Sequence, residues 1–318
     1  MSLRTSSPVA ADVPGGSDRR DILPGSPRHG HRHASRGVLP KSIIRWGRSF
    51  KALPGLEKVA YTIVVGWLVV TVLGPVIAPH SPIAQTTNVL AGPSPAHIFG
   101  TDELGRDVFS RILWGAQITI PYSLLVVALA VLIGSAVGVI AGYFGGWVDE
   151  LLMRVVDLVF AFPSIILAMA IAAALGPSIS NAVVAVVVVS WPAYARVVRS
   201  LVIGAMHSDF VLAARLLGPS SLRAMAVDVL PNVVGPTVVY ATLGLGEAML
   251  ILVGLSFLGL GAQPPTPEWG LMISDAQQYY DHWWLALFPG LSIMSVVFCL
   301  NIAGDRVRDW LDPRMSTA

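Results

Sequence analysis

Charged residues, lysines and cysteines are scarce in this sequence. Only 13% of its 318 residues are Asp, Glu, Lys or Arg, whereas soluble domains carry about 25%. A single cysteine, Cys299, excludes an internal disulfide framework. None of the three lysines lies in the Gly-x4-Gly-Lys-Ser/Thr pattern that holds nucleotide phosphates. We therefore expect no ATPase site in this chain, and the 54% hydrophobic content predicts a membrane protein.

Residue patterns typical of catalytic, cofactor and metal sites are also missing, so we expect no enzyme activity, no bound cofactor and no metal in this chain. Residues 1–40 are rich in Pro, Gly, Ser, Arg and His and lack the apolar core of a signal peptide. His29, His31 and His33 alternate in this segment, as metal ligands can. A solvated tail is favoured instead, because nothing around these side chains would fix a ligand geometry.

Long apolar segments are abundant. A bilayer core of about 30 Å requires roughly 20 apolar residues per helix, and six segments have about this length. Pro163, Pro192 and Pro289 interrupt the third, fourth and sixth of them. The sequence thus predicts an all-α polytopic membrane protein with six transmembrane helices, at approximately 59–78, 118–141, 152–175, 179–198, 233–258 and 283–302.

Lys and Arg are distributed unevenly between the two sides of these spans. Alternate sides carry 19 and 2 of them. Because cytoplasmic loops carry the excess of positive residues, we expect both termini in the cytoplasm. We divide the chain into a disordered basic region (1–55), the first span with an outside loop (56–116), a core of five spans (117–304) and a cytoplasmic tail (305–318).

Two local patterns predict helix contacts. Gly134, Gly138 and Gly142 recur every four residues, which lets a second helix approach closely. This second helix is either another helix of the bundle or a helix of a second subunit. Arg154 and Asp157 are three residues apart at one end of the third span, where we expect them to pair.

Two acidic features stand out near or within the spans. Thr101-Asp102-Glu103 resembles the capped start of a helix, and we expect an outside helix to run from there along the membrane surface into the second span. Glu247 lies near the middle of the fifth span, where an ionisable side chain is costly and usually faces a cavity or a partner. Glu247 is therefore either a residue that lines a transport pathway or a buried structural hydrogen-bonding group.

The connection between the fourth and fifth spans, about 207–232, is longer than a helical bundle requires. Asp209 can cap a short helix that Gly218 ends, and Pro231 stops a second one. Such a helix pair fits either a protrusion that docks on a partner or an amphipathic pair resting on the membrane.

Specific motifs resolve this choice. Ala213-Ala214, Gly218 and Leu230-Pro231 resemble the EAA coupling loop of ABC importer permeases. Four further blocks, in order along the chain, resemble the C-type permease subunits of dipeptide, oligopeptide and nickel importers. They are FGTDELGRDVFSRILWGAQIT (99–119), GYFGGWVDELLMRVVDLVFAFPS (142–164), LSFLGLGAQPPTPEWG (255–270) and GDRVRDWLDPR (304–314).

The resemblance implies a type I ABC importer permease fold in the inner membrane of a bacterium, where the chain would contribute half of a pathway for short peptides. Its partners would be a second homologous permease, two ATP-binding subunits that hold ATP and magnesium, and an extracytoplasmic solute-binding protein. Nickel chelates, glutathione or another small solute are alternative substrates. An ion-coupled secondary transporter is disfavoured, because it would require inverted repeats and several intramembrane acids, and Glu247 is the one firm candidate.

Overall fold

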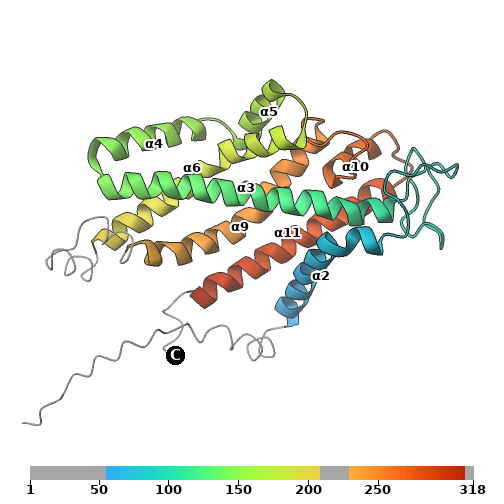
Figure 1. The fold of residues 1–318 in the computed structure, drawn as a ribbon, viewed down its shortest axis with the longest axis horizontal. Coiled ribbons are helices and arrows are strands. Elements are labelled where there is room, and N and C mark those ends of the chain that lie inside the picture. Colours follow the sequence, from blue (N-terminus) through green and yellow to red (C-terminus); the bar gives the residue numbers. More distant parts are fainter. Residues whose placement is uncertain (1–54, 208–228, 312–318) are drawn as a thin grey trace, which may run out of the picture. The chain divides into compact units, whose positions relative to one another are not determined.

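The computed structural model describes residues 55–207 and 229–311. These residues form helices and connecting loops, without an extended β-sheet. The chain order of the helices is visible in Figure 1. They are α2 (Gly55–Ile77), α3 (Val108–Phe144), α4 (Gly146–Phe160), α5 (Ser164–Leu175), α6 (Ile179–Met206), α9 (Leu230–Phe257), α10 (Trp269–Ala276) and α11 (Trp284–Leu311).

The predicted all-α fold with six membrane spans is confirmed, with one span broken. Among the described residues, α2, α3, α6, α9 and α11 are each long and apolar enough to cross a membrane. Helices α4 and α5 supply the sixth span if they are counted together, and they meet at an angle of 87°. Pro192 and Pro289, by contrast, lie inside the continuous helices α6 and α11. Of the three prolines, only Pro163 lies at a break between helices, as expected.

The expected outside helix at Thr101 is wrong. Helix α3 starts at Val108 and its N-cap is Asp107, whose side chain accepts a hydrogen bond from the Ser110 backbone N–H. The preceding segment forms a turn instead, because Asp102 Oδ1 accepts from the backbone N–H groups of Leu104 and Arg106. This turn leads directly into α3, which is 37 residues long and includes the second span.

The glycine repeat of α3 packs against α6 of the same chain. A Cβ atom added at Gly134 would lie 2.5 Å from the carbonyl oxygen of Trp191, and one at Gly138 would lie 2.5 Å from that of Ala195. Both distances are too short for any side chain. The close helix contact that the repeat predicted is thus a contact within the bundle.

The predicted pair between Arg154 and Asp157 is also wrong. Arg154 pairs with Glu150 on its own helix at 2.9 Å, while Asp157 pairs with Arg196 of α6 at 2.6 Å. Glu150 lies four residues before Arg154, a favourable spacing on a helix surface. Asp157 instead pairs with a residue of α6, and the spacing of residues along α4 could not indicate this partner.

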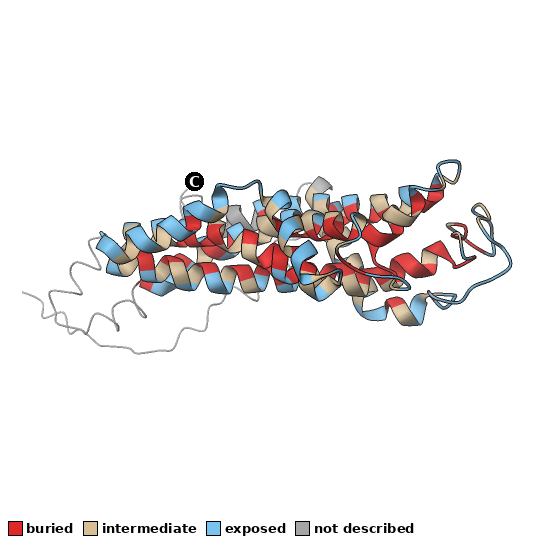
Figure 2. Cartoon of the chain, turned by 90° about the horizontal axis from the view of Figure 1, so that it is seen from above, coloured by how far each residue is buried: buried red, intermediate tan, exposed pale blue. Residues whose placement is uncertain are grey.

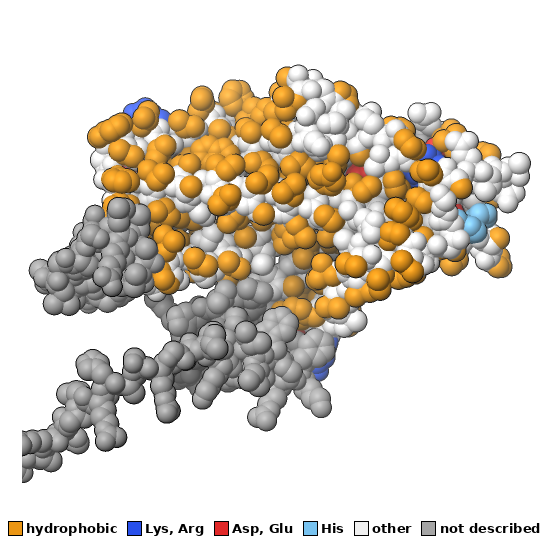
Figure 3. Space-filling model, viewed as in Figure 1, with side chains coloured by type: hydrophobic (Ala, Val, Ile, Leu, Met, Phe, Trp, Pro, Cys, Tyr) orange, Lys and Arg blue, Asp and Glu red, His pale blue; other side chains and the backbone are white. Residues whose placement is uncertain are grey.

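Residues coloured as buried lie mainly along the inner parts of the bundle (Figure 2), and hydrophobic side chains make up much of its visible surface (Figure 3). Val72, Val76 and Leu132 are 71%, 84% and 67% exposed in this single chain. Such exposure of large apolar side chains indicates contact with lipid or with another subunit. Lys and Arg side chains visible in Figure 3 lie toward the ends of the described bundle.

Candidate functional site

Glu247 lies on α9, within the fifth span, and faces a recess of about 160 Å³. The recess forms where α4 breaks into α5, opposite α6 and α9. Glu247 is exposed in the single chain. Further lining residues come from these four helices and from α3, and they include Val127, Phe160, Ser164, Ser190, Tyr194, Tyr240 and Ile251.

Two tyrosines line the same recess as Glu247. Tyr194 of α6 is buried, Tyr240 of α9 is exposed in the single chain, and their ring centroids are 5.3 Å apart. Both phenols lie within electrostatic range of Glu247. Gly244, one turn before Glu247, leaves room for the Tyr194 hydroxyl, since a Cβ atom there would collide with it. The recess therefore combines a carboxylate and hydroxyl groups inside an apolar bundle, which suits a hydrated or cationic ligand.

The break beside this recess is itself informative. Irregular backbone at membrane depth is tolerated only where protein buries it or where it lines a water-filled cavity. Ala161, Phe162 and Pro163 form the break and are exposed in the single chain. A broken span and an intramembrane carboxylate thus line the same recess.

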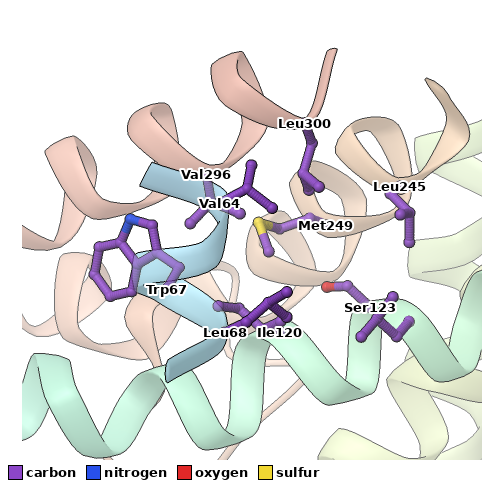
Figure 4. Close-up of a pocket in the computed structure, with 10 residues that line it drawn as sticks. Val64, Trp67, Leu68, Ile120, Ser123, Leu245, Met249, Val296 and Leu300 are labelled. Carbon is purple, nitrogen blue, oxygen red and sulfur yellow. The ribbon is translucent and has the colours of Figure 1, made fainter. Parts of the chain in front are cut away.

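A second cavity, between α2, α3, α9 and α11, has a different character (Figure 4). It holds only about 50 Å³, and its lining is almost entirely apolar. The Trp67 indole N–H already donates to Ser295, and the Ser123 hydroxyl donates to the Thr119 carbonyl. This cavity is too small and too apolar for a peptide.

The ends of the predicted coupling loop are anchored together. Val198 and Val202 of α6 pack in one cluster with Val229 and Val233 at the start of α9. Leu230 and Pro231 occupy the first turn of α9, where the missing N–H of proline costs no helix hydrogen bond. Of the other predicted loop residues, Ala213, Ala214 and Gly218 lie outside the described residues.

The turn before α3 holds a compact charged network. Arg106 pairs with Asp102 and Glu103, each at 2.6 Å, and Arg111 lies 3.5 Å from Asp102. Asp275 of α10 lies 4.0 Å from Arg106. Burial, assisted by the nearby Glu103 carboxylate, raises the pKa of Asp275 to about 6. The network ties the turn to α10, a segment more than 160 residues further along the chain.

Comparison with known proteins identifies the family. The family described as binding-protein-dependent transport system inner membrane component matches residues 134–317. This chain belongs to that family.

Relatives of this transport component cover most of its length. A dipeptide transport system permease protein from Alkalihalophilus pseudofirmus is 44% identical over 87% of this chain and 92% of the relative. One from Escherichia coli strain K12 is 43% identical over 80% of this chain and 87% of the relative. A glutathione transport system permease protein from Pectobacterium atrosepticum is 41% identical over 71% of this chain and 75% of the relative.

The fold of the transport component is also similar to solved structures. A chain of the MetNI methionine ABC transporter, in inward-facing conformations, matches with a TM-score of 0.52 and 18% identity. The match covers 63% of this chain and 96% of that chain. At this identity the likeness supports the fold alone, which is that of an ABC transporter permease.

Two of the sequence blocks that suggested this family meet in space. Glu268 caps α10 by accepting from the Leu271 backbone N–H, and the Thr119 hydroxyl of α3 donates to its other carboxylate oxygen. The indole of Trp269 donates to the Ile112 carbonyl at 3.0 Å. Burial raises the pKa of Glu268 despite these hydrogen bonds. The block at 255–270 therefore holds α10 against the start of the second span.

One group of polar side chains was not anticipated from the sequence. His80, His97 and Asp107 come together between the end of α2 and the start of α3. They are spread over residues 80–107 without a ligand-like spacing. Only the folding of the loop between α2 and α3 brings them together, so no local signal could have grouped them.

Proposed function

We propose that this chain forms half of the translocation pathway of an ATP-driven ABC importer for short peptides. The observation that carries the proposal is the similarity to dipeptide permeases at 43–44% identity over at least 80% of the chain. The polar recess at Glu247 supports it, because a zwitterionic peptide requires polar contacts while it crosses an apolar bundle.

The proposed complex contains a second homologous permease, two ATP-binding subunits and an extracytoplasmic solute-binding protein. ATP and magnesium belong to the ATP-binding subunits, and this chain contributes no catalytic residue. Coupling runs through the loop that carries Ala213, Ala214, Gly218, Leu230 and Pro231. The anchoring of α6 to α9 by Val198, Val202, Val229 and Val233 supports this role, because a force applied to the loop would reach two spans directly.

The proposed orientation places both termini in the cytoplasm of a bacterial inner membrane. The 19-to-2 distribution of Lys and Arg supports it. In a Cys299→Ser background, an impermeant thiol reagent added from outside should label Thr266→Cys and spare Ser220→Cys. Labelling of both positions from the same side would overturn the six-span orientation.

Within the pathway, Glu247 is proposed to attract the positively charged amino terminus of a passing peptide. A charge-assisted hydrogen bond contributes about 1.5–3 kcal/mol, which corresponds to roughly tenfold or more in affinity. Glu247→Gln keeps the shape of the side chain and removes its charge. It should therefore weaken peptide uptake by about tenfold while the complex still assembles.

The experiment measures uptake of a labelled dipeptide by the complete complex in proteoliposomes, with the solute-binding protein and ATP supplied. Glu150→Gln is the matched control, because Glu150 lies on the exposed surface of α4 and forms an ion pair with Arg154 of the same helix. Equal uptake by the two variants would refute the role of Glu247. No uptake of labelled dipeptide by the parent complex, together with uptake of labelled glutathione, would replace the peptide substrate with that of the Pectobacterium relative.

A further inference from the structure

The cluster of His80, His97 and Asp107 offers three metal-ligating side chains. One candidate ligand atom from each residue lies within 4.8 Å of the other two. The rings of His80 and His97 have their centroids 5.1 Å apart. His97 and Asp107 are buried, and His80 is exposed, so the cluster is accessible from the surface through His80.

Hydrogen bonds indicate which histidine nitrogens could face a bound cation. His80 Nε2 lies 3.2 Å from the Ala96 carbonyl oxygen. A carbonyl only accepts, so this nitrogen carries the proton and Nδ1 of His80 has a free lone pair. His97 Nδ1 donates to Asp107 Oδ1 at 2.9 Å, so a cation that takes the place of this proton would have both atoms as ligands. The second nitrogen of His80 is held by a carbonyl, as in many histidines that bind metals.

The backbone around the cluster is also fixed. The Ser110 hydroxyl donates to Asp107 Oδ2 at 2.7 Å and accepts from the His80 backbone N–H at 3.1 Å. Asp107 Oδ2 also accepts from the Ser110 backbone N–H. These bonds occupy one carboxylate oxygen and hold the segment after α2 beside the start of α3. Oδ1, which contacts His97, is the oxygen that remains for a cation.

We propose that His80, His97 and Asp107 bind one divalent transition-metal ion of the zinc class. Two imidazole nitrogens and a carboxylate oxygen match the ligands that zinc takes in proteins, and a water would complete a tetrahedral site. Zinc bonds of about 2.0–2.1 Å place tetrahedral ligand atoms about 3.4 Å apart. Rotation of the exposed His80 ring closes the present separation. The bound ion would then join the segment after α2 to the first turn of α3.

Zinc binding to the complete complex, purified without a polyhistidine tag, tests the site. His29, His31 and His33 are first replaced by Ala, so that they do not contribute. Competition with a chromophoric chelator should then detect a zinc ion on the complex that His80→Gln binds at least tenfold more weakly. Zinc sites on copurifying subunits contribute equally to the parent and to His80→Gln, so they do not affect this comparison. The glutamine amide can still donate to the Ala96 carbonyl, so His80→Gln preserves that bond.

His207→Gln is the matched control, because His207 is also exposed and also contacts a backbone carbonyl, that of Ile203. It should bind zinc like the parent. A second variant, His80→Cys, keeps a metal ligand and should retain binding, with a thiolate-to-cobalt absorption band when Co²⁺ is used instead. Equal zinc affinity in the parent and His80→Gln, or no cobalt–thiolate band in His80→Cys, would overturn the proposal.

Discussion

Replacing Gly138 by alanine should destabilise the bundle at the contact between α3 and α6. The added Cβ atom would lie 2.5 Å from the Ala195 carbonyl oxygen and 2.9 Å from both the Arg199 backbone nitrogen and the Val198 Cβ. Two of these neighbours are backbone atoms of α6, so no side-chain rotation can relieve the clash. The helices must move apart, and overpacking of this kind costs about 1–3 kcal/mol.

Alanine also favours a helix over glycine by up to about 1 kcal/mol, which would partly conceal this cost. Gly66→Ala in α2 corrects for it, because a Cβ atom there meets nothing within 4 Å. Helix propensity then contributes similarly to both variants. The difference of about 1–3 kcal/mol between them measures the clash, and it corresponds to roughly 5- to 150-fold in the unfolding equilibrium.

Unfolding of the purified chain by increasing SDS in mixed micelles, followed by tryptophan fluorescence, measures this difference. Equal unfolding midpoints for Gly138→Ala and Gly66→Ala would refute the close contact within the chain. If the glycine repeat instead packed against a second subunit, Gly138→Ala would weaken subunit association and leave the unfolding of the isolated chain unchanged.

Two further predictions concern charged pairs. Arg199→Gln should cost about 1.5–3 kcal/mol of stability, because Arg199 makes two hydrogen bonds to Asp149, at 2.5 and 2.6 Å, in a partly buried pair. Arg154→Gln should change the stability by less than about 1 kcal/mol, since the pair of Arg154 with Glu150 is exposed. Equal SDS unfolding midpoints for these two variants would contradict this prediction. The raised pKa of Asp275, about 6 against 3.8, means that the folded state holds this proton more tightly than the unfolded state, so its stabilising contribution is present below pH 3.8 and is lost as pH rises through about 6. Asp275→Asn should therefore remove part of the fall in Tm between pH 4 and pH 7, and an unchanged fall would contradict the assignment.

The membrane spans could be predicted because each is a continuous run of apolar residues in the sequence. The effect of each proline on its helix could not be predicted in this way. Pro163 and Pro192 both lack the N–H that a continuous helix uses. Pro192 is buried within the bundle, and packing on its surroundings holds α6 together across the missing bond. Ala161, Phe162 and Pro163 are exposed, so no equivalent packing opposes the 87° bend. Burial distinguishes the two prolines, and burial depends on helices distant in sequence.

The same distinction applies to the candidate sites. Glu247 could be found from the sequence, because a carboxylate within an apolar segment is conspicuous by itself. Its partner Tyr194 could not, since it comes from another helix and fits only because Gly244 leaves space for its hydroxyl. Glu247 lies on continuous α9, while the opening beside it arises from the break between α4 and α5. The acid and the opening thus have independent origins in the sequence, and their meeting in one recess supports the proposed pathway at that recess.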